Sequence, residues 1–212
     1  MKRCITLLFV FLAAGILLPN ESFAAEKAWQ NLFDGKTLNG WIQRNGKAQY
    51  TVEDGMIVGT TVLNTPNSFL CTEKLYTDFI LELEFLIEPG MNSGIQIRSH
   101  SFEHFKDYRV HGYQVEIDTS DRAWSGGIYD EARRGWLYPL KDKPEAQKAF
   151  KQNQWNHYRI EAVGDRIRTW VNGVAAADLQ DDMTSTGFIA LQVHASKEAG
   201  RKIKWRNIRI QD

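Results

Sequence analysis

Two segments of the sequence carry polar side chains whose types and spacing suit chemistry on a hydroxylated ligand. In NSGIQIRS, Gln96 and Arg98 alternate with isoleucines, and in GYQVEIDTS, Gln114, Glu116 and Asp118 alternate with apolar residues. Successive side chains of a β-strand point to opposite faces, so each segment is predicted to place its polar residues on one face. If the two strands lie near each other in one sheet, amides, one guanidinium and two carboxylates converge on one surface. These groups donate and accept hydrogen bonds, so the set suits binding of a hydroxylated ligand better than the residues typical of a solvated outer face would.

A third segment, FIALQVH, adds Gln192 and His194 on one predicted face and turns its apolar residues inward. We therefore expect Gln192 and His194 beside Glu116. Glu116 or Asp118 has the chemistry of a general base, and His194 that of an acid, a base or a metal ligand. The competing interpretation is structural: the two carboxylates form an ion pair with Arg98 on a sheet face, and a single histidine at a strand end is more often structural than catalytic.

The longest predicted irregular region runs from Ser120 to Gln154 and is rich in aromatic residues. A loop of that length in a compact protein is usually functional or disordered, and the aromatic residues argue against disorder. We expect Tyr129, Arg134 and Trp136 to contact a ligand, with part of this region closing over it. The alternatives are that the arginine belongs to a solvated charge run and that the tryptophan only anchors the loop.

The elements that must position these residues are short strands separated by turn signals such as Asp54-Gly55, Pro89-Gly90, Gly164-Asp165 and Asn172-Gly173. Ten segments are predicted to be strands: Ala48–Glu53, Met56–Gly59, Phe69–Thr72, Phe79–Ile87, Gly94–Ser99, Gly112–Asp118, Trp155–Val163, Arg166–Val171, Phe188–His194 and Ile203–Ile210. One segment, residues 144–151, has helical character because proline suits the first turn. Many strands with regular turns predict an all-β, antiparallel sandwich of two sheets.

The first residues predict export. Basic residues at positions 2 and 3 precede an apolar run from Ile5 to Leu18, and Ser22 and Ala24 supply a small-residue cleavage site. This is the pattern of a secretory signal peptide over residues 1–24, and the run is short for a membrane span of roughly 20 residues. We expect a bacterial protein that is periplasmic or secreted, begins at Ala25 and has no integral membrane segment after cleavage.

Removing 24 residues from 212 leaves 188, which suits one domain over residues 25–212. The whole chain has 26 basic and 26 acidic residues, a balance that does not indicate nucleic acid as a partner. Only Cys71 follows the predicted signal peptide, so the exported domain has no internal disulfide and depends on its core. The oligomeric state is not determined by these features.

Several motifs in a fixed order carry a family resemblance. They are LFDGKTLNGW, NSGIQIRS, GYQVEID, SGGIYDEARRGWL, NQWNHYRIEAVGDRIRTWVNG, GFIALQVH and KWRNIRI. Together they resemble the 3-keto-disaccharide hydrolase domain family over about Trp29 to Gln211. The resemblance implies a concanavalin-like or laminarinase-like jelly roll from glycan-degrading bacteria that cleaves glycosides oxidised to a ketone at carbon 3. A carbohydrate is then the expected partner.

The implied substrate has a definite reactivity, because a ketone at carbon 3 acidifies the hydrogen on carbon 2. A base removes that proton, the resulting enediolate expels the group at carbon 1, and water adds to the unsaturated sugar. Such a site needs a base and a stabiliser for the oxyanion, for which Arg98, Gln96 or a bound cation would serve. A divalent cation would find suitable oxygen and nitrogen ligands here, but no diagnostic spacing identifies a metal site.

Two other functions use the same predicted sandwich. One is a non-catalytic carbohydrate-binding module, which is favoured if no carboxylate on the polar face is poised to take a proton. The other is a retaining glycosidase of the laminarinase type, because Glu116 and Asp118 resemble the start of a Glu-x-Asp-x-x-Glu strand. In this sequence Asp121 stands where the second glutamate belongs. Retaining hydrolysis needs two carboxyl groups about 5 Å apart, so the shorter side chain disfavours that function.

Overall fold

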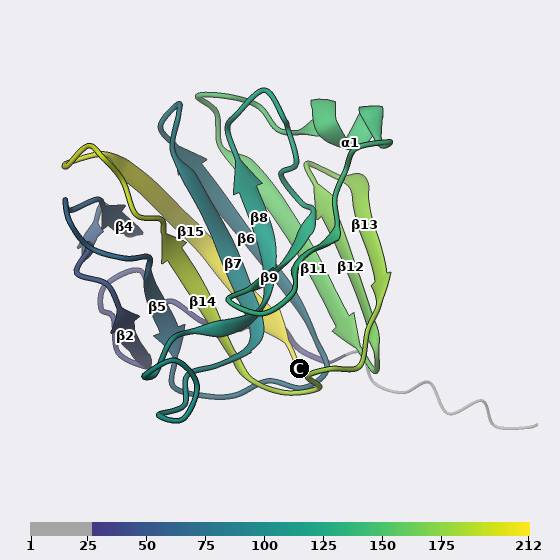
Figure 1. Cartoon of the computed structure of the whole chain (residues 1–212), viewed down its shortest axis with the longest axis horizontal. Coiled ribbons are helices and arrows are strands. Elements are labelled where there is room, and N and C mark those ends of the chain that lie inside the picture. Colours follow the sequence, from purple (N-terminus) through teal and green to yellow (C-terminus); the bar gives the residue numbers. More distant parts are fainter. Residues whose placement is uncertain (1–26) are drawn as a thin grey trace, which may run out of the picture.

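The computed structural model describes residues 27–212, so the predicted signal peptide lies outside the described residues. Two antiparallel sheets pack face to face, as Figure 1 shows. The all-β, two-sheet sandwich predicted from the turn signals is therefore confirmed. None of the helices within residues 27–212 is long and apolar enough to cross a membrane.

The seven-stranded sheet carries the polar segments. In spatial order its strands are β10 (Gly135–Tyr138), β9 (Ile128–Glu131), β8 (His111–Asp118), β7 (Asn92–His100), β14 (Phe188–Val193), β5 (Ser68–Thr72) and β2 (Trp41–Asn45). The predicted NSGIQIRS and GYQVEID strands are therefore direct neighbours, with Gln96 opposite Gln114 and Gly94 opposite Glu116. The FIALQVH strand pairs with the other side of β7.

The eight-stranded sheet forms the second layer. Its main path is β13 (Val174–Gln180), β12 (Arg166–Val171), β11 (Asn156–Val163), β6 (Phe79–Ile87), β15 (Lys202–Gln211), β4 (Met56–Thr60) and β3 (Gln49–Glu53), with β1 (Gln30–Asn31) pairing with β15. The short helix α1 (Pro144–Ala149) lies near β13 and ends two residues before its predicted end.

The core lies between the two sheets and is built by the alternation of each strand. Ile95 and Ile97 of β7 and Val115 and Ile117 of β8 are completely buried in this core. Because side chains alternate across a strand, the polar residues between them must emerge on the outer face of the seven-stranded sheet. The burial of these apolar residues thus fixes which side of the sheet carries the candidate site.

All ten predicted strands are present, and their ends differ from the prediction by two residues at most. The prediction of an irregular region from Ser120 to Gln154 is wrong in part, because β9 and β10 lie within it. These two four-residue strands extend the sheet beyond β8. They were missed because each is short and lacks a clear alternating pattern. Their extended conformation comes from sheet pairing, of β9 with β8 and of β10 with β9.

Candidate functional site

A groove of about 610 Å³ lies on the outer face of the seven-stranded sheet. We call it the central groove, and it is lined by Asn67, Asn92, Arg109, Gln114, Glu116, Asp118, Ser120, Arg122, Tyr129, Glu131, Trp136, Gln192 and His194. Its size falls within the range typical of sites for small ligands. The groove brings together seven of the ten sequence-predicted site residues, namely Glu116, Asp118, His194, Gln114, Tyr129, Trp136 and Gln192.

Glu116 lies in the groove with a side chain that is only 6% exposed. Asn92 Nδ2 donates a hydrogen bond to Glu116 Oε1 at 2.6 Å, and Gln114 Nε2 donates to Oε2 at 2.7 Å. The Arg122 guanidinium is 3.5 Å from Oε1. Burial raises the pKa of Glu116 to about 7, against the opposing effect of these donors and with a further increase from the charge of Asp118.

Asp118 has the opposite electrostatic character, although it is only two residues away. Burial by itself would raise its pKa, but the donors around its carboxylate lower the pKa below the usual value. Arg122 Nε donates at 2.8 Å and Ser120 Oγ at 2.7 Å, and the backbone N–H of Trp124 donates at 3.2 Å. Asp118 is therefore ionised, and its oxygens are engaged by hydrogen-bond donors. Glu116, in contrast, is poised to exchange a proton near neutral pH.

Three glutamine side chains form a hydrogen-bonded network that leads to Glu116. Gln114 Oε1 accepts hydrogen bonds from Gln96 Nε2 at 2.6 Å and from Gln192 Nε2 at 2.8 Å. Ser99 Oγ in turn donates to Gln96 Oε1 at 2.8 Å. With its oxygen committed to two donors, Gln114 can only present its NH₂ group to Glu116. Gln96 itself is completely buried and does not line the groove. The prediction that it contacts a ligand is therefore wrong, and Gln96 instead orients Gln114.

Gln192 carries a buried acceptor that has no partner among the described residues. Its side chain is completely buried, and no donor within residues 27–212 reaches its Oε1 atom. A buried carbonyl oxygen without a partner is costly, and such atoms call for an explanation such as a bound ligand or water. Gln192 lines the groove, yet its Oε1 atom has almost no exposed surface, so a ligand would reach this acceptor only if neighbouring side chains moved.

Aromatic side chains and one guanidinium form the wall beside the two carboxylates. The ring centroids of Trp136 and Tyr129 are 5.3 Å apart, and those of Trp124 and Trp136 are 4.8 Å apart. Arg122 lies over both tryptophan rings, 4.9 Å from each centroid. This arrangement holds a cation next to Glu116 and Asp118.

His194 follows β14 directly and is exposed at the edge of the groove. Its Nδ1 atom lies 2.8 Å from the backbone oxygen of Ala195. Since that oxygen can only accept, Nδ1 carries the proton in this contact, which leaves Nε2 available to a ligand. Gln192, His194 and Glu116 line the same groove, as the alternation of FIALQVH predicted.

The predicted position of Arg98 is wrong. Its backbone has a left-handed conformation with φ of 45°, and the pairing of β7 with β8 shifts between Ile97 and His100. This irregularity interrupts the alternation, so the side chain does not emerge beside Gln96. Instead it is completely buried, with Nε donating to the oxygen of Thr77 and Nη1 to the oxygen of Gly164. Arg98 thus joins two turns of the protein rather than the site.

Arg134 is also absent from the groove, contrary to the prediction. It binds Asp130 and Asp181, and its Nη1 atom is 2.8 Å from Asp181 Oδ2. Arg133 binds Asp130 as well, at 2.6 Å. The Asp-Glu-Ala-Arg-Arg-Gly motif therefore fixes the turn between β9 and β10, and these strands are part of the sheet. This arrangement does not support the prediction that part of the region from Ser120 to Gln154 closes over a ligand.

Sequence reasoning missed Asn92 and Arg122. A signal for Asn92 was present, because it continues the alternation of Gln96 back through Gly94 along β7. Arg122 had no such signal, because its position follows from the turn after β8. Among residues 27–212, no group of three or more His, Cys, Asp or Glu side chains is arranged to hold a metal ion.

Residues 28–211 match the sequence family described as 3-keto-alpha-glucoside-1,2-lyase-like domains. This match covers nearly the whole described chain and agrees with the resemblance carried by the motifs. No curated protein was found to match the chain.

Solved structures share the fold at low sequence identity. A putative glycosyl hydrolase from Parabacteroides distasonis is 20% identical with a TM-score of 0.63, over 87% of this chain and 93% of that one. The carbohydrate binding module CBM66 from Bacillus subtilis is 21% identical with a TM-score of 0.55, over 82% and 96%. A prokaryotic β-1,3-1,4-glucanase (lichenase) from a mouse hindgut metagenome is 12% identical with a TM-score of 0.56, over 87% and 98%. Both enzymes and binding modules therefore use this sandwich, and the fold alone does not decide between them.

Proposed function

The chain belongs to the family of 3-keto-alpha-glucoside-1,2-lyase-like domains, and we propose that it cleaves glycosides whose sugar carries a ketone at carbon 3. The observation that supports this most is the buried carboxylate of Glu116 in the central groove, whose pKa is raised by burial to about 7. A carboxylate of that basicity is suited to removing a proton that a neighbouring ketone has made acidic. A carbohydrate-binding module has no need of such a group.

In the proposed first step, Glu116 takes the proton from carbon 2 of the sugar. The electron pair of the broken bond moves toward the ketone, so that negative charge develops on the oxygen at carbon 3. Arg122 takes the role that the sequence suggested for Arg98, because its guanidinium lies beside both carboxylates. A fixed positive charge next to the developing oxyanion lowers the barrier to its formation.

In the second step, the electron pair returns to form a double bond between carbons 1 and 2, and the bond from carbon 1 to the leaving oxygen breaks. His194 in its doubly protonated form is the proposed donor of a proton to that oxygen, through the ring nitrogen that faces away from Ala195. Water then adds to the unsaturated sugar, with its hydroxyl group on carbon 1 and a proton on carbon 2. Glu116 exchanges the abstracted proton with solvent, supplies a proton to carbon 2 and is regenerated as the base, while the remaining proton of the added water returns to His194.

The proposal includes export from a bacterial cell to the periplasm or the medium. It rests on the signal-peptide pattern of residues 1–24. Expression of the full chain in a bacterial host, followed by N-terminal sequencing, is expected to give a protein that begins at Ala25. A protein that retains Met1 and remains with the membrane fraction would replace the cleaved form by an anchored one.

The chemistry is tested with purified residues 25–212, a glycoside and the 3-keto derivative of the same glycoside, in deuterated water. We expect cleavage of the 3-keto derivative alone, and a 3-keto sugar product with deuterium at carbon 2 beyond the level of spontaneous exchange. Product without that deuterium would exclude elimination and point to direct displacement at carbon 1. Tight binding of both sugars without cleavage would identify a carbohydrate-binding module. Cleavage of the unoxidised glycoside would identify an ordinary glycosidase.

A retaining glycosidase of the laminarinase type is disfavoured by the position of Asp121. This residue is exposed, lies beyond the end of β8 and is outside the groove lining. Asp118 is the groove carboxylate nearest to Glu116 in sequence, and it accepts hydrogen bonds from Arg122 and Ser120. The arrangement therefore offers one carboxylate with a raised pKa rather than a matched pair across a glycosidic bond.

A further inference from the structure

Arg122 differs from Glu116 in how the fold places it, because it lies in the turn that follows β8 and not on a strand. Its side chain is 39% exposed. Its Nε atom donates to Asp118 at 2.8 Å, and its Nη2 atom is 3.5 Å from Glu116. Ion pairs of a partly exposed side chain contribute little by themselves, because ordering the long side chain costs entropy. A further contact is needed to keep the guanidinium beside Glu116.

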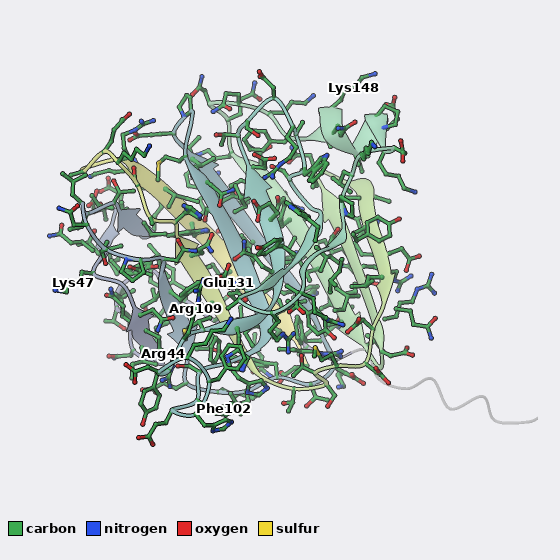
Figure 2. The ribbon with its side chains drawn as sticks, viewed as in Figure 1. Arg44, Lys47, Phe102, Arg109, Glu131 and Lys148 are labelled. Carbon is green, nitrogen blue, oxygen red and sulfur yellow. The ribbon has the colours of Figure 1, made fainter. Side chains whose placement is uncertain are left out.

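The backbone of the turn that carries Arg122 is fixed by neighbouring elements. Thr169 Oγ1 of β12 donates to the backbone oxygen of Gly126 at 2.6 Å. Gln147 Nε2 of α1 donates to the backbone oxygen of Arg122 at 3.2 Å. Figure 2 shows the next residue of α1, Lys148, pointing away from the molecule. The freedom that remains to Arg122 is therefore the rotation of its side chain.

Trp136 restricts that rotation. The guanidinium carbon of Arg122 lies over the Trp136 ring, 4.9 Å from the ring centroid. A cation is attracted to the face of an aromatic ring, most strongly to that of tryptophan. The Trp136 ring is itself packed against Trp124 and Tyr129, with interplanar angles of 82° and 70°. Its orientation is therefore fixed independently of Arg122.

Trp136 lies on a different element from Arg122, whereas Trp124, whose ring also contacts Arg122, belongs to the same turn. Trp136 is in β10, which pairs with β9 and through it with β8. The indole packs closely on the turn, because a Cβ atom at Gly127 would lie 3.3 Å from Trp136 Cζ3. The short strands β9 and β10 thus extend the sheet far enough to place an aromatic ring over the guanidinium.

We propose that Trp136 is a positioning residue, whose indole ring holds the Arg122 guanidinium against Glu116, and that it is not a stacking platform for a sugar ring. One face of the indole is already covered by Arg122. For the reaction, this inference rests on the proposed function, in which Arg122 stabilises the oxyanion. The positioning itself is a property of the free protein, so it is measurable without substrate.

The carboxylate of Glu116 reports where the guanidinium is. The polar groups around this carboxylate and its backbone are Asn92, Gln114, Asp118, Arg122 and Tyr158. Of the charged ones, Asp118 raises the pKa of Glu116 and Arg122 lowers it. Movement of the guanidinium away from Glu116 therefore raises this pKa above about 7. Carbon-13 NMR of the glutamate carboxyl groups follows the titration, and the spectrum of Glu116→Gln identifies the signal.

The test compares the titration of Glu116 in the wild type, Arg122→Gln, Trp136→Leu and the double variant. We expect Arg122→Gln to raise the midpoint by about 1–3 pH units, because a nearby opposite charge is removed. Trp136→Leu keeps an apolar side chain without an aromatic face, and is expected to raise the midpoint by about 0.4–0.7 pH unit. Because Trp136 acts through Arg122, its replacement is expected to cause no further change in the Arg122→Gln background.

Two matched controls separate this effect from general ones. Trp155→Leu also removes an indole, one that lies 3.9 Å below the guanidinium of Arg206 on the eight-stranded sheet. Lys148→Gln removes a positive charge from an exposed position of α1. Both are expected to leave the Glu116 midpoint unchanged. Trp136→Phe retains a smaller aromatic ring and is expected to raise the midpoint less than Trp136→Leu does.

A wild-type midpoint in Trp136→Leu would overturn the proposal, and weaker binding of methyl 3-ketoglucoside by that variant would then identify a stacking platform. Equal rises in the wild-type and Arg122→Gln backgrounds would also overturn it, because Trp136 would then act without Arg122. If Trp136→Leu does not fold, Trp136→Phe decides by the same comparison of backgrounds. A wild type that cleaves no 3-keto glycoside would remove the proposed function, whereas the titration of Glu116 would still decide whether Trp136 positions Arg122.

Discussion

Glu116 and Asp118 point to the same face of one strand, yet their surroundings shift their pKa values in opposite directions. Burial dominates at Glu116 and raises its pKa to about 7, whereas at Asp118 the effect of burial is outweighed by donors from Arg122, Ser120 and Trp124. Separation of two neighbouring pKa values is a common basis for assigning acid and base roles. It supports the proposal that Glu116 is the base and that Asp118 holds Arg122 in position.

Replacement of Glu116 by glutamine is expected to lower kcat/KM about 10²-fold to 10⁴-fold, because it removes the proton acceptor while retaining the shape of the side chain. In the wild type, kcat/KM is expected to rise with pH through about 7, as Glu116 loses its proton. Asp121→Asn, which alters an exposed carboxylate outside the groove, serves as the control. Turnover by Glu116→Gln close to the wild-type rate would assign the base to another residue.

A second residue-scale prediction concerns Gln96, which does not touch the groove. Gln96 and Gln192 both donate to Gln114 Oε1, and this fixes the NH₂ group of Gln114 toward Glu116. Gln96→Leu removes one of the two donors, so Gln114 is free to rotate away from Glu116 part of the time. Loss of a donor to the carboxylate raises its pKa, and we expect the midpoint of the pH profile to move to higher pH. A profile with the wild-type midpoint would reduce Gln96 to a core-filling role.

At the scale of elements, strand alternation was a reliable guide where the strand is regular. It predicted the outward face of β8 and of β14, because every second residue there is fixed by the core. It failed at Arg98, where a left-handed residue breaks the pattern, and no feature of the sequence marked that irregularity. Alternation also could not predict the position of Arg122. This residue lies in a turn, where the direction of a side chain depends on the conformation of the turn and not on the two-residue repeat of a strand.

The side chain of Gln114 packs directly against Gly94, where a larger residue would displace it. A Cβ atom at this position would lie 2.5 Å from Gln114 Cδ, a contact that cannot form without displacing the glutamine. Gly94→Ala is therefore expected to lower the free energy of unfolding by about 1–3 kcal/mol, as for other overpacked sites. Because the displaced side chain is the donor to Glu116, activity measured well below the melting temperature should also fall.

Chemical denaturation and kcat/KM, measured on the same preparation, check both effects of Gly94→Ala. Gly90→Ala is an informative comparison, because no atom lies within 4 Å of a Cβ there, although its positive φ of 77° adds backbone strain. It is expected to reduce stability while leaving Gln114 in place. A Gly94→Ala protein that loses stability but retains full activity would show that Gln114 does not control Glu116.

At the scale of the whole molecule, the two outer faces of the sandwich differ in how their charges are used. On the eight-stranded sheet, Glu82 binds both Arg159 and Arg209, and Glu84 binds Arg206. These are paired charges on a partly solvated face, and such pairs contribute little to stability individually. The face of the seven-stranded sheet instead buries Glu116 among amides, with its charge less well compensated. The structural interpretation of a sheet-face ion pair therefore fits the eight-stranded sheet better than the candidate site.

The burial of Glu116 has a consequence for the stability of the whole protein. Its pKa is about 7 in the folded protein, compared with 4.5 for an unperturbed glutamate, so the folded state binds the proton more tightly. The stability from this tighter binding is fully present below pH 4.5 and is lost as the pH rises through about 7. The shift corresponds to a loss of about 3 kcal/mol across that interval.

Glu116→Gln cannot ionise and should lack this loss. We therefore expect the free energy of unfolding of the wild type, measured in urea at several pH values, to fall relative to that of Glu116→Gln between about pH 4.5 and pH 7. Groups with lowered pKa values, such as Asp181 at about 2, destabilise both proteins equally at lower pH and cancel in the comparison. Parallel curves for the two proteins would mean that Glu116 is ionised at little cost. The raised basicity on which the proposed proton abstraction depends would then be absent.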